Sequence, residues 1–121
     1  MQSAAKAYGD VAKQVSDPRQ LEANLLLQAA SRLQSINDNW DTKQRELDDA
    51  LLYNRKLWSI FMTSVTSTDN PLPSTVRQNV ANLGLFVMNQ TLAMMSNPEP
   101  TQLKPLININ RELAAGLLGR G

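Results

Sequence analysis

The chain has 121 residues, 42% of them hydrophobic and 19% charged, a composition typical of one folded domain. Its formal net charge is +1, with Lys and Arg dispersed along the length, which argues against direct binding of nucleic acid. The absence of cysteine and histidine excludes disulfides, catalysis by a thiolate or a histidine, and the usual zinc ligands. We therefore expect a protein that binds no metal ion or cofactor and is not an enzyme.

Apolar residues recur at spacings of three and four between prolines, and no alternating strand pattern occurs. This pattern predicts a short helix over about 2–14 and longer helices over about 18–38, 41–67, 73–96 and 102–118. Because the predicted connections are short, we expect an all-α fold: a single up-and-down bundle of four main helices plus the short N-terminal helix, with residues 1–121 as one domain.

The predicted helix boundaries rest on capping residues and prolines. Asp17 and Pro18 indicate one helix start, and Asp41 with Gln44 has the spacing of a capping box. Pro73 can open the next helix, whereas Pro105 fits only near the start of the last one.

Cellular location is also suggested by the hydropathy pattern. No apolar run approaches the roughly 20 residues that a membrane span requires. The first residues, MQSAAKAYGDV, lack the consecutive apolar core of a signal peptide. We therefore expect a cytoplasmic protein that does not insert into a membrane.

Several side-chain amides fall on the apolar faces of the predicted helices. Asn54 lies in the middle of the face formed by Leu47, Ala50, Leu51, Leu57, Trp58, Phe61 and Val65. Asn79 and Gln90 lie on the stripe of Val76, Val80, Leu83, Val87 and Met94, and Asn110 is surrounded by Leu103, Leu106, Ile107, Leu113, Ala114 and Leu117. Because an unpaired buried amide costs roughly 1–3 kcal/mol, we expect these amides to form a structural polar core; the alternative is a ligand-binding amide cluster.

Glu22 projects from the apolar face of the helix predicted over 18–38. A carboxylate there requires a cation if it is buried, and Arg55 and Arg111 are the candidates, each at the border of its own stripe. One alternative is a catalytic site in which Glu22 acts as a general acid or base together with Arg55 and Tyr53. A second alternative is that the two arginines bind an anionic ligand, although the sequence has no Gly-rich phosphate-binding loop beside them.

The helix predicted over 73–96 has a second apolar strip, formed by Ala81, Leu85, Met88, Leu92 and Met95. A helix that is apolar on two sides is either central in the bundle or offers one side to a partner. Flexible methionines suit a groove that accepts amphipathic helices. Gly84 indicates close approach of a neighbouring helix, and the helix predicted over 2–14, with few large apolar groups, could cover part of the strip.

Four stretches together resemble the FlaF family of flagellar biosynthesis regulators: AAKAYGDVAKQVSDPRQLEANLL, ALLYNRKLWSIFMTSVTSTDNPLP, VRQNVANLGLFVM and LININRELAAGL. The resemblance covers nearly the whole chain in the expected order. It implies a small cytoplasmic protein of flagellum assembly that binds flagellin before export and works alongside the regulator FlbT. Terminal segments of new flagellin are amphipathic and unpaired until they pack in the filament.

The residues and the resemblance together predict a non-enzymatic, chaperone-like protein that binds flagellin and promotes its synthesis and secretion. The expected partner-binding residues are Leu85, Met88, Leu92, Met95 and Met62, with Leu52 at the border and Gln78, Asn89 and Gln90 as polar rims. The alternative is a post-transcriptional regulator of flagellin expression that acts with FlbT or directly on flagellin messenger RNA.

Overall fold

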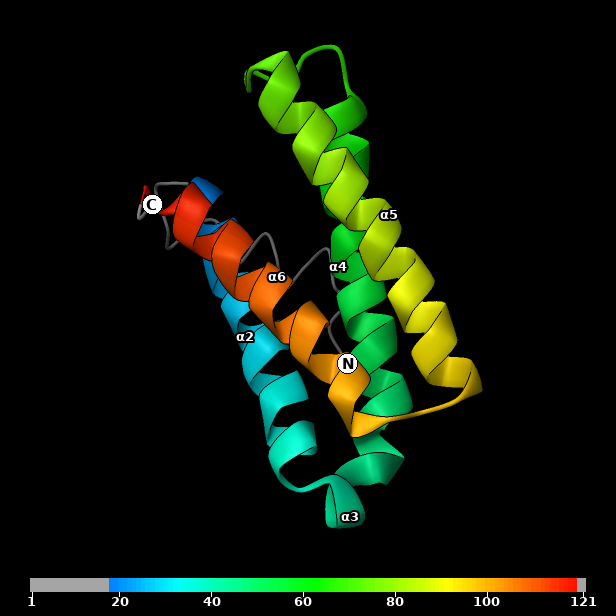
Figure 1. Ribbon diagram of the computed structural model, residues 1–121. Coiled ribbons are helices and arrows are strands. Elements are labelled where there is room, and N and C mark those ends of the chain that lie inside the picture. The colour runs from blue at the N-terminus through cyan, green and yellow to red at the C-terminus, as the bar shows by residue number, and fades with distance from the viewer. Residues whose placement is uncertain (1–17, 120–121) are drawn as a thin grey trace, which may run out of the picture.

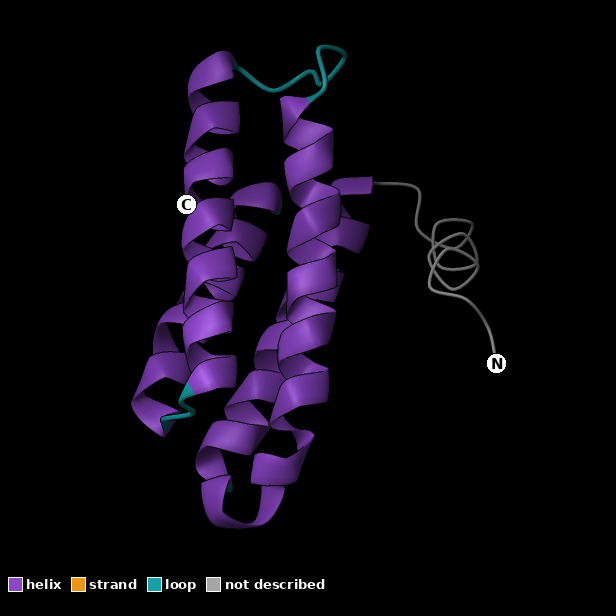
Figure 2. Cartoon of the chain, turned by 90° about the vertical axis from the view of Figure 1, so that its right-hand side faces the viewer, coloured by secondary structure: helices purple, strands orange, loops and turns teal. Residues whose placement is uncertain are grey.

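The described part of the chain, residues 18–119 of a computed structural model, is built from helices, and no strand occurs in it (Figures 1 and 2). The helix predicted over 2–14 lies outside these residues, as does Asp17. The elements are α2 (Pro18–Asp38), α3 (Trp40–Lys43), the 3₁₀ helix η1 (Gln44–Glu46), α4 (Leu47–Thr66), α5 (Ser74–Ser96), the 3₁₀ helix η2 (Pro100–Gln102) and α6 (Leu103–Leu117). The predicted all-α class is confirmed.

The helix predicted over 41–67 is wrong in its first part, where the chain turns a corner. The Asn39 side chain donates to the backbone carbonyl of Ser35 at 2.9 Å at the end of α2. Asn39, and not Asp41, is the N-cap of α3, because the backbone N–H groups of Thr42 and Lys43 bond to its carbonyl. Two short helices therefore precede α4, which begins at Leu47.

Pro105 lies in the first turn of α6, directly after η2. The first helical N–H groups have no partner inside the helix, so a proline costs little there. The prediction that Pro105 fits only near the start of the last helix is therefore confirmed.

The helices pack as two antiparallel pairs. The most extensive contacts are those of α2 with α6 and of α4 with α5; α2 also packs against α4, whereas α5 contacts α6 only slightly. Figure 1 shows the two pairs meeting near α3 and separating towards the opposite end, where the loop between α4 and α5 lies. The bundle is therefore closed at one end and splayed at the other.

The core lies where α2, α4 and α6 meet. Its largest fully buried side chains include Trp58, Leu26, Leu33, Ile36 and Leu106. The indole of Trp58 meets the ring of Phe61 edge-on, with centroids 6.1 Å apart. These contacts supply the apolar burial that holds the two pairs together.

Candidate protein-binding surface

Two of the predicted core amides, Asn54 on α4 and Asn110 on α6, are fully buried and bonded to each other. Asn110 Nδ2 donates to Asn54 Oδ1 at 2.7 Å, and Asn110 Oδ1 accepts from the indole Nε1 of Trp58 at 2.8 Å. A longer contact of 3.5 Å joins Asn110 Nδ2 to the backbone carbonyl of Leu26 on α2. The cluster thus connects three helices, as expected for a polar pin that selects one packing register.

The cluster is not fully satisfied. Among the described residues, Asn54 Nδ2 has no hydrogen-bond acceptor although it is buried. An unpaired buried donor lowers the stability of the fold by roughly 1–3 kcal/mol, so Asn54 carries an energetic cost. Asn110, whose amide bonds to both Trp58 and Asn54, is the stabilising centre of the cluster. The amides of this cluster face the core and not a surface, which argues against the alternative of a ligand site.

The prediction for Asn79 is wrong, because this residue is exposed. The buried face of α5 consists of Val80, Gly84, Val87, Thr91 and Met94. Successive helical residues are turned by about 100°, so Asn79, directly before Val80, points away from the core. Val76 and Leu83 of the predicted stripe are likewise exposed and lie at its edge.

Two other polar residues of α5 do find partners. Gln90 is half-buried and donates through Nε2 to the backbone carbonyl of Gln102 at 3.1 Å, so it ties α5 to η2 and is not a rim of the strip. Thr91 is fully buried and escaped the sequence analysis; its hydroxyl donates to the Val87 carbonyl at 2.6 Å. Thr91 follows Gly84 by seven residues and Val87 by four, so the helical spacing could have placed it on the same buried face of α5.

Arg55 and Arg111 are exposed, so neither belongs to the polar core. Glu22 is half-buried at the start of α2, where Arg19 lines the same pocket. Tyr53 and Arg55 are two residues apart on α4 and therefore point in nearly opposite directions. The structure does not gather Glu22, Arg55 and Tyr53 into one site.

Helix α5 lies at the edge of the molecule. It packs on α4 and barely touches α6 (Figure 1). The interpretation that α5 is a central helix wrapped by the others is therefore wrong, and its second apolar strip needs another explanation.

Charge is nearly absent from α5. Arg77 is the one charged residue among its 23 residues, whereas the 20 residues of α4 include Asp48, Asp49, Arg55 and Lys56. Exposed positions of α5 carry Asn, Gln, Ser, Ala, Leu and Phe instead. Depletion of charged residues on an exposed apolar surface is characteristic of the centre of protein–protein interfaces.

The second strip of α5 combines exposed and half-buried side chains. Leu85 and Leu92 are 57% and 54% exposed, and Met88 and Met95 are half-buried and pack against the core. Together with half-buried Met62 of α4 these residues form what we call the α5 strip: Leu85, Met88, Leu92, Met95 and Met62. The leucines project into solvent, and the methionines form an adaptable floor beneath them.

Gly84 allows α4 to approach α5 beside this strip, as predicted. A Cβ atom at Gly84 would lie 2.5 Å from Sδ of Met62. Helices α4 and α5 are antiparallel and rise equally, by 1.5 Å per residue. Because Met62 lies beside Gly84, the residue ten positions before Met62, which is Leu52, lies level with Met94 and Met95, ten or eleven positions after Gly84. Leu52 is exposed and can extend the α5 strip at that end.

The other flank of α5 forms a shallow hollow with α6. It is lined by Asn79, Asn82, Leu83, Phe86 and Ile109, and Phe86 is 43% exposed. Both flanks of α5 are thus apolar, with amides as their polar groups.

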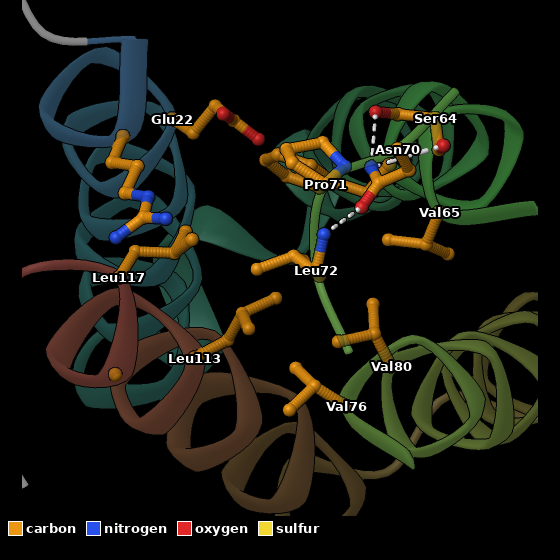
Figure 3. Close-up of a pocket in the computed structure, with 13 residues that line it drawn as sticks. Glu22, Ser64, Val65, Asn70, Pro71, Leu72, Val76, Val80, Leu113 and Leu117 are labelled. Carbon is orange, nitrogen blue, oxygen red and sulfur yellow. Dashed lines mark hydrogen bonds between the residues drawn. The ribbon is translucent and has the colours of Figure 1, made fainter. Parts of the chain in front are cut away.

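A deeper pocket of about 510 Å³ lies at the splayed end of the bundle, between the two helix pairs (Figure 3). Five segments line it: the start of α2, the end of α4, residues 70–72, the start of α5 and the end of α6. Asn70 shapes its edge, because its Oδ1 accepts from the Leu72 N–H at 2.9 Å and its Nδ2 donates to the Ser64 carbonyl at 3.1 Å. Figure 3 shows Leu72 between the side chains of α6 and those of α4 and α5.

Residues 18–119 offer neither a membrane-spanning helix nor a cluster of metal ligands. None of the helices between residues 18 and 119 has the length and apolarity to cross a lipid bilayer. Within the same residues, no group of three or more acidic side chains is placed to hold a metal ion.

The model of the family described as flagellar protein FlaF matches residues 4–117. No curated protein and no solved structure shows significant similarity to the chain.

Proposed function

Because the chain belongs to the FlaF family of flagellar proteins, we propose that it is a non-enzymatic binding protein that holds flagellin before its export. The ligand would be an amphipathic terminal helix of flagellin, which is unpaired until it packs in the filament. Covering that helix would prevent premature assembly in the cytoplasm and keep the subunit available for secretion.

The observation that supports this proposal is the character of α5. An exposed helix with a single charge and projecting leucines is costly for a protein that has no partner for it. Leu85 and Leu92 are seven residues apart, two turns along one side of the helix. An incoming amphipathic helix that lies along α5 would bury both leucines and contact the methionine floor.

The proposal assigns recognition to apolar packing with amide hydrogen bonds rather than to charge. Gln78 and Asn89 are exposed on α5 and can bond to polar groups at the edge of the bound helix. Because α5 has so little charge, we expect the affinity for flagellin to change little between low and high salt.

Calorimetry with purified flagellin tests the α5 strip. The double variant Leu85→Glu and Leu92→Glu should weaken binding by about tenfold or more, because each change places a charge in an apolar contact. Both side chains are more than half exposed, so the fold should persist, which circular dichroism would verify.

The matched control is Ile60→Glu. Ile60 is 52% exposed on α4, two residues before Met62, and so points nearly opposite to the α5 strip. We expect it to bind flagellin as the wild type does. Two results would refute the assignment of the α5 strip as the binding surface. One is an equal loss of flagellin affinity in Ile60→Glu and in the double variant, and the other is wild-type affinity in the double variant.

An RNA-binding role predicts a different result. Direct contact with flagellin messenger RNA would require a cluster of cations and an affinity that falls steeply with salt. A gel shift at two salt concentrations separates the two functions: we expect no specific shift at either. Binding of FlbT by the α5 strip without flagellin would instead favour the indirect regulatory role.

A further inference from the structure

The methionines of α4 and α5 differ in their surroundings. Met94 is fully buried in the core, whereas Met88 and Met95 are half-buried along the α5 strip. The sulfur of Met62 is packed against Gly84, where an added Cβ atom would lie 2.5 Å from it. Met94 and Met95 are therefore neighbours in the sequence with opposite environments, one enclosed by the core and the other bordering solvent.

Access to solvent determines which of these sulfurs an oxidant can reach. The chain has no cysteine, so its thioethers are its only sulfur groups open to oxidation. Met88 and Met95 are seven residues apart, which places them about 10 Å from each other on one side of α5. Because α5 packs mainly on α4 at the edge of the molecule, local opening of the helix further admits small molecules to this side.

We propose that Met88 and Met95 form a site of reversible oxidation by oxidants of the peroxide class. A sulfur lone pair attacks one oxygen of hydrogen peroxide, so that an S–O bond forms, the O–O bond breaks and the second oxygen leaves as water. The sulfur loses two electrons, which the peroxide gains. A methionine sulfoxide reductase reverses the step: the sulfoxide oxygen leaves as water while two thiols become a disulfide.

Oxidation changes the floor of the α5 strip from apolar to polar. Each sulfoxide adds a hydrogen-bond acceptor between the projecting side chains of Leu85 and Leu92 and the core. An apolar partner that covers the strip would also cover this acceptor, and a covered polar group without a donor opposes binding. The effect on flagellin rests on the proposed function, whereas the selective oxidation of Met88 and Met95 does not.

Mass spectrometry of the folded full-length protein tests the site. After treatment with dilute hydrogen peroxide, fragmentation of the peptides places each added oxygen on an individual residue. We expect Met88 and Met95 to be oxidised about tenfold faster than Met94, which serves as the internal control because it lies on the same helix and is buried. In concentrated urea the three rates should become equal. Equal rates in the folded protein, or faster oxidation of Met94, would overturn the proposal.

Reversal is tested on the same oxidised sample. The two classes of methionine sulfoxide reductase, one for each sulfoxide epimer, are added with dithiothreitol as the thiol. We expect Met88 and Met95 to return to the thioether in the folded protein. Oxygen retained on both residues would overturn the assignment of a reversible site.

Calorimetry with flagellin measures the consequence for binding. Oxidation should weaken the wild-type affinity about tenfold, and treatment with the reductases should restore it. The double variant Met88→Leu and Met95→Leu has no sulfur at the site, so peroxide should leave its affinity at its own untreated value. The matched control Met94→Leu retains both sulfurs and should respond to peroxide as the wild type does. An equal response of the double variant would place the sensitive group elsewhere and would overturn the proposal.

The failure of this proposal and the failure of the proposed function give different results. If the untreated protein does not bind flagellin, the proposed function is refuted, and the map of oxidised residues still decides whether Met88 and Met95 are the site. If the untreated protein binds flagellin and the protein oxidised at both residues binds equally well, control of binding by oxidation is refuted and the proposed function stands.

Discussion

The pair of buried asparagines offers the sharpest test of how the core is held, because their roles differ. Asn110 bonds to both Trp58 and Asn54, whereas Asn54 Nδ2 has no acceptor among the described residues. Replacement by leucine keeps the branched shape of the side chain, with bulkier methyl groups at both positions, and removes the amide. Asn110→Leu and Asn54→Leu should therefore have unequal effects on stability.

The difference follows from the groups that each change leaves unpaired. Asn110→Leu leaves the Trp58 indole N–H and the Asn54 carbonyl oxygen buried without partners, in addition to the existing orphan Nδ2. At roughly 1–3 kcal/mol for each group, the cost is about 3 kcal/mol. Asn54→Leu removes the orphan donor and leaves Asn110 Nδ2 with the long contact to Leu26, so its cost is about 1 kcal/mol or less.

Urea unfolding followed by circular dichroism measures both variants and the double variant. After both changes the Trp58 indole is the main group left unpaired, so the double variant should be more stable than the sum of the single effects predicts, by about 1–2 kcal/mol. Equal costs for the two single variants, or strict additivity, would refute the assignment of Asn110 as the centre of the cluster.

Further predictions concern three positions. Gly84→Leu should destabilise by about 1–3 kcal/mol in urea unfolding because its Cβ would lie 2.5 Å from Met62 Sδ, and Met62→Ala should recover part of the loss. Asn70→Ala should cost about 1 kcal/mol and speed hydrogen exchange of the Leu72 amide, whose bond to Asn70 is lost. Thr91→Val should stay within about 1 kcal/mol of the wild type in thermal unfolding, because the lost hydroxyl bond is to a carbonyl inside the same helix.

Helix positions were largely predictable from periodicity, and the exceptions are instructive. The prediction over 18–38 matches α2, and those over 73–96 and 102–118 differ from α5 and α6 by single residues at their ends. The break between α3 and α4 was missed, because Asp41 and Gln44 have a capping-box spacing that the backbone bonds to Asn39 override.

Burial on amphipathic helices was more predictable than burial on α5. Asn54 and Asn110 stand on stripes with one clear centre, and both are in the core. On α5 apolar residues occur on nearly every side, so periodicity could not define the buried face, and Asn79 was assigned to it wrongly. For the same reason the sequence could not decide between a central and a peripheral α5.

Sites that combine residues from several helices could not be predicted from the sequence. The pocket at the splayed end is lined by residues from five segments, and it exists only because the two helix pairs separate there. Arg55 and Arg111 were candidate partners of Glu22 by their border positions, yet both are exposed. Helical spacing predicts a face, but only the packing of whole helices determines which faces meet.

Hydrogen exchange of the full-length protein with and without flagellin tests most directly whether α5 is the partner-binding helix. Because α5 packs mainly on α4, its amides should open locally more readily than those of the α2–α6 pair. We expect added flagellin to slow exchange across residues 81–96 and to leave α2 and α6 unchanged. Protection confined to α2 and α6, or unchanged exchange along α5 at saturating flagellin, would contradict this account.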